Sequence, residues 1–387
     1  MQNSQRSLKV ADLFSGAGGM SLGFQAAGFD IVSAFDKWGT AVECYSRNLP
    51  GHTVFEQDLS DVISVSSLLR SKEIDVIIGG PPCQDFSTAG KKVEGERASL
   101  TKSFALIVAE VRPPFFVMEN VQSAKRSEAF SFARATFKSA GYGLTEIVLD
   151  ASFCGVPQRR KRFFCIGILN GQDGVLAETL ISRQTDLPRT VRDCLEGISP
   201  MQFYYAHPRT YRRRAIFSID EPAPTVRSGG NRPMPPDYKR HPADPAVPST
   251  ERIRALTMEE RAALQMFPTN YIWSENRLDN ELLISNAVPV GLAKFVGDAL
   301  LAFIKNPTTA PRNCFLYWLC SKKKLSMKQA YSVLHNYRKA HSFISGPRKT
   351  DHTLLWHLAR NADFKKCSER QKNELVAACK LHMLFSC

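Results

Sequence analysis

The chain has 387 residues, of which 43% are hydrophobic, so it is long enough to bury one large core or two domains and too apolar to be disordered. It contains no run of about eighteen apolar residues, and the segment Met1 to Lys9 is polar, so we expect neither a membrane span nor a signal peptide. This favours the cytoplasm, where the ten cysteines are thiols. None of them forms a C-x-x-C pair typical of a zinc or redox site.

Positive charge is concentrated near the C-terminal end. The formal net charge of +14 at pH 7 indicates a polyanionic partner, without separating DNA from RNA or an acidic membrane surface. From Asn306 onward about 15 Lys and Arg stand against about 4 Asp and Glu, so roughly +11 of the charge lies in the last fifth of the chain.

The first predicted elements form a strand, a glycine-rich turn and a helix. Val10–Phe14 predicts a strand that enters Ser15–Gly19, and a helix is predicted over 22–27. This order is typical of a nucleotide-type cofactor site, because backbone without side chains lets a ligand approach a helix N-terminus. The third glycine of a dinucleotide fingerprint is replaced by Ser21, so the turn alone is equally consistent with an ordinary tight turn.

Two further predicted strands end at aspartates. The strand over 31–35 is followed by Asp36, which is placed to bond ribose hydroxyls, and the strand over 53–55 ends near Asp58, placed to bind an adenine amino group. Either aspartate alone would be interpreted as a turn or helix cap. Their order along the chain, one after each strand, favours a cofactor site at one sheet edge.

The next two strand ends carry a cysteine and a glutamate. Cys83 follows the apolar strand 74–78 and a Gly-Gly-Pro-Pro turn, and Glu119 follows the strand 113–118. A lone cysteine is usually an inert packing residue, and a lone glutamate a surface group or cap. Together they suggest a nucleophile and its acid partner. The basic cluster 158–162, before a strand over 163–168, is either a solvated surface or a grip on a base carbonyl and phosphates.

The combination resembles the cytosine-5 DNA methyltransferases of bacterial restriction-modification systems. The motifs that carry the resemblance, in order, are Asp12–Gly19, Gly80–Gln84, Glu119–Val121, Gln158–Arg162, Arg254–Pro268 and Ser285–Pro289. The chain departs from the family pattern at Met266 and Ser285, where the family usually has glycine. These departures bear on helix and cofactor packing more than on activity.

The resemblance implies a Rossmann-like α/β fold of the class I S-adenosylmethionine-dependent methyltransferases, with a mainly parallel sheet. The expected catalytic and cofactor-binding domain covers residues 1–168 and is completed by 280–305, and the target-recognition small domain covers 169–279. Residues 306–387, where the resemblance ends, show helical spacing over 326–341, 352–360 and 369–384. This basic helical extension is expected either to add DNA contacts or to be a solvated or partner-binding appendage.

The implied activity is methyl transfer from S-adenosylmethionine to C5 of a flipped-out cytosine in a short specific duplex sequence. Cys83 would add covalently to C6, Glu119 would help protonate N3, Arg162 would bind the base O2 and Arg160 would support Glu119. No metal is expected. The residues that match the family's cofactor site are Phe14, Gly16, Gly18, Asp36, Asp58, Pro81 and Asn286.

Further contacts with double-stranded DNA are implied outside the reacting centre. Ser87 and Arg97 are expected on phosphates, in a loop over 88–99 that closes over the flipped base, and Arg227 and Arg232 are expected to grip guanine edges or phosphates. The expected setting is a monomer in the bacterial cytoplasm, associated with the nucleoid, beside a restriction endonuclease acting on the same site. Two alternatives stay open: a tRNA cytosine-5 methyltransferase and a catalytically silent DNA-binding regulator.

Overall fold

The computed structural model describes residues 7–82, 96–195, 201–210, 212–248, 252–305 and 361–386, together with positions 323, 329, 332–333, 336–337, 339–340, 355 and 358. The side chains of residues 96–99 and 382–386 are not described. The chain forms two compact units. The first consists of Met1–Ala177 and Pro188–Ile304, and the second of Glu178–Leu187 and Lys305–Cys387.

The first unit is built on a seven-stranded sheet with the strand order β3-β2-β1-β4-β5-β7-β6. Strands β1 to β5 pair in parallel, while β7 is antiparallel to both of its neighbours. This mainly parallel α/β sheet confirms the predicted fold class. The strands are β1 (Lys9–Leu13), β2 (Asp30–Asp36), β3 (Thr53–Glu56), β4 (Val76–Gly79), β5 (Phe115–Val121), β6 (Tyr142–Asp150) and β7 (Lys161–Leu169).

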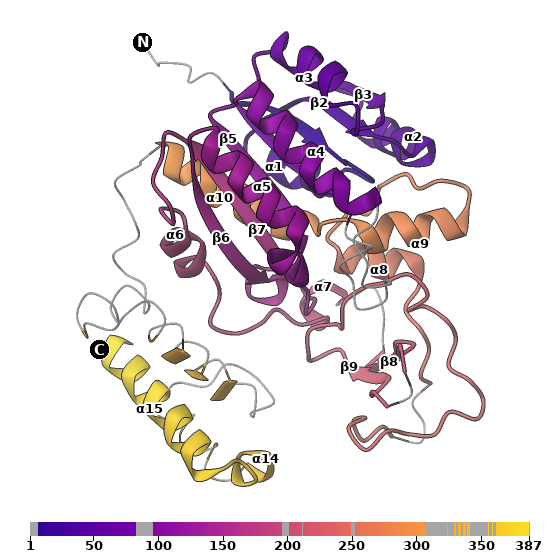
Figure 1. Cartoon of the computed structure of the whole chain (residues 1–387). Coiled ribbons are helices and arrows are strands. Elements are labelled where there is room, and N and C mark those ends of the chain that lie inside the picture. The colour runs from indigo at the N-terminus through magenta and orange to yellow at the C-terminus, as the bar shows by residue number, and fades with distance from the viewer. Residues whose placement is uncertain are drawn as a thin grey trace, which may run out of the picture. The chain divides into compact units, whose positions relative to one another are not determined.

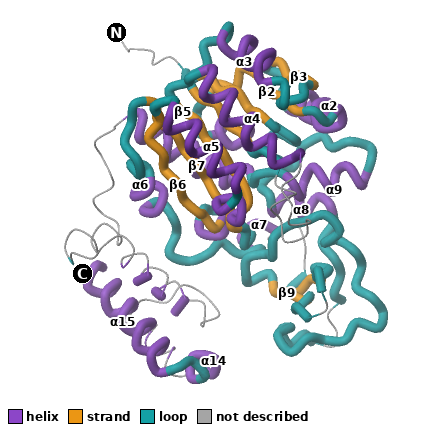
Figure 2. Tube along the Cα trace, viewed as in Figure 1, coloured by secondary structure: helices purple, strands orange, loops and turns teal. Residues whose placement is uncertain are grey.

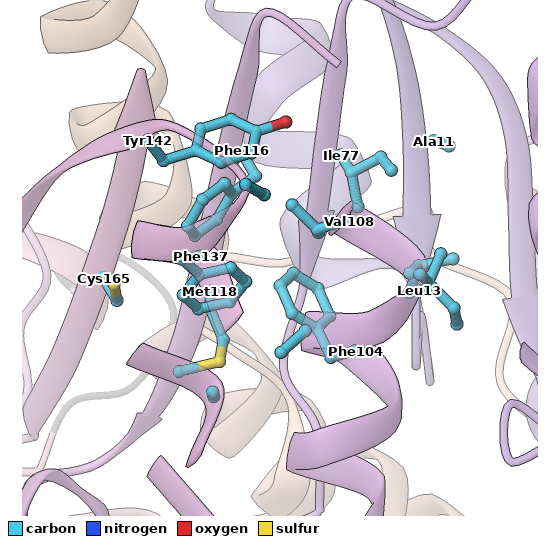
Figure 3. Packing of buried hydrophobic residues seen from close by; sticks show 14 of the residues in the cluster. Ala11, Leu13, Ile77, Phe104, Val108, Phe116, Met118, Phe137, Tyr142 and Cys165 are labelled. Atoms are coloured by element: carbon cyan, nitrogen blue, oxygen red, sulfur yellow. The ribbon is translucent and has the colours of Figure 1, made fainter. Parts of the chain in front are cut away.

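One face of the sheet is covered by α3 (Val62–Arg70), α4 (Glu96–Val111) and α5 (Glu128–Ser139) (Figure 1). Phe104, Phe116 and Phe137 meet at its centre (Figure 3), and the rings of Phe116 and Phe137 lie 4.2 Å apart. Such buried aromatic pairs stabilise the packing of these helices on the strands. The main chain is helical from Glu96, so the loop expected to run to Ser99 ends earlier than the sequence suggested.

A second helical contact joins an early and a late segment of the first unit. Helix α1 (Gly19–Ala26) packs on α10 (Val290–Lys305) and the residues before it. A Cβ atom on Gly19 would lie 2.2 Å from the carbonyl oxygen of Val288, and one on Gly23 would lie 2.5 Å from Cβ of Ala293. Glycine is therefore required because the two backbones touch. Helix α2 (Gly39–Asn48) follows β2.

The stretch Arg277–Lys305 has the length and composition of a membrane-spanning helix within the described part of the chain, with a mean hydropathy of 1.8 in its most apolar window. The sequence predicts no such span. The stretch consists of α9 (Arg277–Asn286) and α10, which are separated by non-helical residues 287–289. Because α10 buries Leu292, Val296 and Leu300, it has the character of a core helix, which passes the same test.

The segment that follows β7 in the first unit is mostly loop (Figure 2). We call residues 201–248, without 211, the β8–β9 region. Its regular elements are the antiparallel strands β8 (Phe203–Tyr205) and β9 (Ile216–Ser218), and the short helix α7 (Arg192–Leu195) precedes it. Tyr204, Phe217 and Val226 share a buried apolar cluster with Leu264 of α8 (Met258–Leu264) and Ile284 of α9. This cluster fixes the loops on the helices behind them.

The second unit has its own small core. The unit contains α14 (Ala362–Lys365), α15 (Glu369–Ser386) and most of α6 (Ala177–Ser182). The core residues are Tyr337, Ala340, Leu358, Phe364, Leu375, Ala378 and Cys379. The helix predicted over 369–384 corresponds to α15. Of the helices predicted over 326–341 and 352–360, only scattered positions are described, and those are helical.

Candidate active site

The ends of β5 and β7 bring Glu119 and Arg162 together. In this antiparallel pair Val121 lies opposite Arg162 and Glu119 opposite Phe164, so Glu119 and Arg162 are diagonal neighbours on one face. Arg162 Nε lies 2.8 Å from Glu119 Oε1, and the two side chains are only 14% and 9% exposed. The contact is an ion pair, and Oε1 accepts no aligned hydrogen bond from the described residues. Arg162 thus holds the Glu119 carboxyl at the meeting point of the two strands.

Burial controls the protonation of Glu119. Loss of hydration raises the pKa of this carboxyl, and the nearby positive charges of Arg162 and Arg160 oppose the rise without cancelling it. A carboxyl with a raised pKa keeps a proton at higher pH than an exposed glutamate does. This is the property that a general acid needs near neutral pH.

The turn after β4 lies directly beside Glu119. A Cβ atom on Gly80 would be 3.1 Å from Glu119 Oε2, and the side-chain amide of Asn120 donates to the carbonyl oxygen of Pro81 at 3.3 Å. Pro81 is buried. The described part of the turn is therefore held against the glutamate. Cys83 and Ser87 lie outside the described residues, and Arg97 belongs to α4 without a described side chain.

Arg160 is 2% exposed and links segments far apart in the sequence. Its guanidinium donates to the carbonyl oxygen of Val226 at 3.1 Å and to those of Ser285 and Ala287, each at 3.0 Å. It acts on Glu119 through its charge, while its described hydrogen bonds go to main-chain oxygens. Arg160 thus connects the β8–β9 region to the end of α9.

A buried amide pair reinforces this junction. Gln158 accepts from the backbone N–H of Val226 at 2.9 Å and donates to Gln265 Oε1 at 2.9 Å. Gln265 in turn donates to the carbonyl oxygen of Ile284 at 2.5 Å. Both glutamines are fully buried, so each lost bond would leave a polar group unpaired. The network holds the basic segment 158–162 in one arrangement.

At the opposite part of the sheet edge, Asp36 closes the glycine turn. Its two carboxylate oxygens accept from the backbone N–H groups of Gly16, at 2.8 Å, and Trp38, at 2.9 Å. Gly16 and Gly18 have φ values of 52° and 75°, in the left-handed region that glycine favours. Burial raises the pKa of Asp36. The turn therefore has a defined shape next to a carboxylate.

The same turn is supported from behind by a buried polar chain. Ser21 Oγ donates to Asp12 Oδ2 at 2.7 Å, and the hydroxyl of Tyr45 donates to Ser21 Oγ at 2.7 Å and lies 2.8 Å from His52 Nε2. Asp12 Oδ1 accepts no hydrogen bond from the described residues. Burial raises the pKa of Asp12 to about 7, and the charge of Asp36 acts in the same direction.

The remaining cofactor candidates lie around this turn. Phe14 follows β1 with a φ of 61° and packs on the main core. Asp58 is partly exposed, and its hydrogen bond from Lys37 at 2.5 Å lowers its pKa to about 2. Asn286 is exposed at the end of α9, one residue before Ala287, whose Cβ lies 3.5 Å from a Cβ placed on Gly19. Six of the seven candidates thus lie at the ends of β1 to β3 or beside the glycine turn; Pro81 is on the turn after β4.

The chemistry of these groups fits S-adenosylmethionine. A Cβ atom on Gly16 would meet no atom of the described residues within 4 Å, so these residues leave space over the turn. Asp36 and Asp58 are carboxylates that accept from hydroxyl or amino groups, and the open glycine turn precedes the N-terminus of α1. The two carboxylate acceptors and the space over the turn suit a nucleoside with free hydroxyls.

A cleft of about 1550 Å³ extends from Arg162 to the β8–β9 region. Its lining includes the end of β5 and residues of the following turn Gln122–Arg126, together with Tyr205, His207 and Arg227. No Asp or Glu is among the described residues that line it. The lining cations are Lys125, Arg126, Arg159, Arg162, Arg209, Arg213, Arg214, Arg227 and Arg261. Such a surface suits a polyanion.

Positive groups crowd together in one part of this cleft. Burial lowers the pKa of His207, and the charges of Arg232 and Arg227 lower it further. Burial likewise lowers the pKa of Arg227, with Arg209 and Arg232 as further causes. Arg232 is exposed and does not line the cleft itself. The predicted contacts Arg227 and Arg232 are therefore neighbours in a cluster that bound anions would stabilise.

Comparison with known proteins identifies the family. Residues 8–302 match the profile of the C-5 cytosine-specific DNA methylases. The type II methyltransferase M.HindV of Haemophilus influenzae is 48% identical over 301 residues, which cover 78% of this chain and 98% of the relative. M.HgiDI of Herpetosiphon aurantiacus is 46% identical over 301 residues, covering 78% of this chain and 96% of the relative.

The chain belongs to the C-5 cytosine-specific DNA methylases. It is an enzyme of the DNA (cytosine-5) methyltransferase class, and this interpretation is supported over the tRNA-methylating and silent alternatives. The structure of the S. pombe Dnmt2 methyltransferase shares the fold, with a TM-score of 0.58 at 20% identity, covering 78% of this chain and all of that one. The family also supports S-adenosylmethionine as the methyl donor and DNA as the substrate.

Met266 and Ser285, the two departures of this methylase from its family pattern, both lie in well-packed positions. Met266 has a φ of 63°, in the left-handed region where a side chain is strained and glycine is favoured. Its sulfur occupies the space beside Gly291, where an added Cβ would lie 2.3 Å from Sδ. Ser285 is buried, and its carbonyl oxygen accepts from Arg160. The methionine is therefore accommodated by a glycine on the facing helix.

Several residues that organise this site have no role predicted from the sequence. Gln158 and Gln265 lie in motifs of the family, so their positions indicate importance. The sequence does not show that the two side chains form a hydrogen bond with each other. Arg261 and Glu281 gave no signal, because each lies in an otherwise ordinary helical segment. Their buried ion pair depends on how α8 and α9 meet.

Proposed function

We propose that this methylase transfers a methyl group to C5 of a flipped-out cytosine in a short specific duplex sequence, through a covalent adduct of Cys83. The observation that carries the proposal is the buried Glu119–Arg162 pair, whose arginine lines a cleft rich in cations. An acid and a fixed guanidinium at this point suit the N3 and O2 edge of a single pyrimidine. A base inside a duplex does not reach them, so it leaves the stack at a cost of a few kcal/mol.

The proposed reaction begins with addition of the Cys83 thiolate to C6 of the base. Glu119 gives its proton to N3 as the carbon–sulfur bond forms, which leaves C5 nucleophilic. S-adenosylmethionine, when bound, supplies an electrophilic methyl group on a sulfonium. As C5 takes the methyl carbon, the methyl–sulfur bond would break and its electron pair would stay on sulfur, leaving S-adenosylhomocysteine. The C5 proton then passes to a base, the electrons of the C5–H bond form the C5=C6 double bond as Cys83 leaves C6, and N3 returns its proton to Glu119.

Each arginine has a separate task in this proposal. Arg162 binds the base O2 and keeps Glu119 in place, since its Nε already lies 2.8 Å from Oε1. Arg160 lowers the cost of ionising Glu119 after proton transfer and fixes the strand end through its main-chain hydrogen bonds. The raised pKa of Glu119 supports its role as the acid.

The cofactor is proposed to lie over the glycine turn. Asp36 is placed for the ribose hydroxyls and Asp58 for the adenine amino group, which requires that Lys37 shares or releases Asp58. Asp36 keeps acceptor capacity, because each oxygen has a second lone pair. We propose no metal in the reaction. The full proposed set is Phe14, Gly16, Gly18, Asp36, Asp58, Pro81 and Asn286.

The domain organisation proposed from sequence assigns catalysis to residues 1–168 with 280–305 and target recognition to 169–279. The lining of the cleft by the β8–β9 region supports this division of roles. Ser87 and Arg97 are proposed phosphate contacts, and Arg227 and Arg232 are proposed DNA contacts. The basic helical residues 306–387 are proposed to add non-specific DNA contact.

The biological setting is proposed by analogy with the relatives, which are named as type II methyltransferases. In this proposal the enzyme works as a monomer in the bacterial cytoplasm, on nucleoid DNA. It protects that DNA from a restriction endonuclease that acts on the same site, without forming a stable complex with it.

The test is methyl transfer from tritiated S-adenosylmethionine to unmethylated genomic DNA and to bulk tRNA, followed by bisulfite sequencing. The wild type should label DNA, with modified cytosines in one short context, and Cys83→Ala should not. Cys154→Ala is the matched control, because Cys154 is a buried thiol outside the proposed chemistry. Label in tRNA alone, or label in DNA that survives Cys83→Ala, would contradict the proposal.

A further inference from the structure

Behind the positive cluster of the cleft lies an ion pair that is almost completely buried. Arg261 of α8 and Glu281 of α9 pair with side-chain exposures of 3% and 6%. Each partner also holds the turn that follows Val226. Arg261 Nη2 donates to the carbonyl oxygen of Arg227 at 2.6 Å, and the side-chain amide of Asn231 donates to Glu281 Oε1 at 2.6 Å. The turn 227–231 is therefore attached to the two helices at both of its ends.

The turn is also closed internally. The N–H of Gly230 donates to the carbonyl oxygen of Arg227 at 3.1 Å, and Gly229 adopts a φ of 72°. The N–H of His207 donates to the carbonyl oxygen of Gly230 at 3.0 Å, and the Arg227 guanidinium donates back to the carbonyl oxygen of His207. Both the main chain and the side chain of Arg227 are thus fixed.

Arg227 lines the cleft that Arg162 also lines. Its guanidinium donates to the carbonyl oxygens of His207 and Ser228, and its five N–H groups leave donors for a ligand. A phosphate contact needs no such support, since an exposed arginine on a flexible stem satisfies it. Arg213 is an arginine of that kind: it lines the same cleft, is exposed and pairs with no acid among the described residues. Recognition of a base edge, by contrast, requires donors held within a narrow tolerance, and the commonest such contact joins arginine to guanine O6 and N7.

Resting on the proposed function, we propose that Arg227 reads a guanine edge in the target sequence and that Arg261 and Glu281 are its positioning residues. The ion pair fixes the backbone of the turn, and the turn fixes the guanidinium. Among the described residues, the hydrogen bonds and ion pair of Arg261 and Glu281 involve neither the proposed cofactor turn nor Glu119. Loss of the pair should therefore change sequence preference without changing use of S-adenosylmethionine.

The first experiment measures methylation of a duplex library with randomised flanking positions, read by bisulfite sequencing. Arg227→Ala should lose the preference for guanine at one position by about 10- to 100-fold, the range for a bidentate contact. Arg213→Ala is the control. It should weaken methylation at all sequences alike and reduce the slope of log affinity against log salt by about 1. The same uniform behaviour in Arg227→Ala would make it a phosphate contact and overturn the proposal.

The second experiment tests the positioning role. Removing one partner leaves a buried unpaired charge, so single variants risk unfolding, whereas replacing both by apolar residues of similar size is often tolerated. The double variant Arg261→Met/Glu281→Leu should melt near the wild-type temperature, keep its KM for S-adenosylmethionine and lose preference at the same position as Arg227→Ala. A folded double variant that keeps the preference would overturn the positioning role.

The two proposals fail in different ways. If the wild type methylates no DNA, the proposed function is wrong and this inference falls with it. If the wild type methylates one short context and Arg227→Ala keeps every base of that context, the inference alone is wrong.

Discussion

Asp12 offers a test of how burial sets the electrostatics of the cofactor turn. Its pKa is raised from 3.8 to about 7, chiefly by burial, so the folded protein keeps a proton that the unfolded chain releases. The stability from the protonated form is complete below pH 3.8 and is lost as the pH rises through about 7. At about 1.4 kcal/mol per pH unit, this interval corresponds to roughly 4 kcal/mol.

Asp12→Asn removes the titration and keeps the shape of the side chain. The amide oxygen still accepts from Ser21, while the amide N–H groups replace an oxygen that has no hydrogen bond from the described residues. An unpaired amide costs about 1–3 kcal/mol, so the variant should be more stable than the wild type at pH 8 by about 1–3 kcal/mol. At pH 5 this difference should disappear or reverse.

The assay is urea unfolding at several pH values between 5 and 8, comparing the wild type, Asp12→Asn and the control Asp237→Asn. Asp237 is an exposed aspartate of the β8–β9 region, so its variant should follow the wild type at every pH. If Asp12→Asn is less stable than the wild type at pH 8 and keeps the same pH dependence, then Asp12 is ionised in the folded protein and the reasoning from burial is wrong.

Three further outcomes are expected. Glu119→Gln should lower kcat roughly 100- to 10,000-fold with an unchanged KM for S-adenosylmethionine, measured by initial rates, and a change in KM alone would contradict its role as acid. Gly291→Ala should lower the free energy of unfolding in chemical denaturation by about 1–3 kcal/mol, because the added Cβ meets the Met266 sulfur. Adding Met266→Gly to the same chain should recover most of this stability. If the losses of the two variants simply add, the contact is refuted. Truncation after Pro307 should preserve methyl transfer and give weaker non-specific DNA binding with a shallower salt slope; unchanged binding would remove the DNA-binding role of the extension.

Local sequence signals determined the sheet and the order of the site along it. Apolar runs that end in glycine, proline or an acidic residue mark buried parallel strands, and ligand sites of such sheets lie at their carboxyl ends. Asp36 and Glu119 were found this way, and both lie at predicted strand ends. The membership in the methylase family also follows from the motifs in the sequence, since residue types at fixed spacing are local information.

Only the tertiary structure decided which of these residues support one another. Arg162 reaches Glu119 because β7 pairs antiparallel with β5, and α1 meets α10 because glycine allows the backbones to touch. The Arg261–Glu281 pair depends in the same way on the meeting of α8 and α9. Such contacts join residues that are tens to hundreds of positions apart. Their energy comes from burial and pairing in the assembled core, so no stretch of sequence carries the signal by itself.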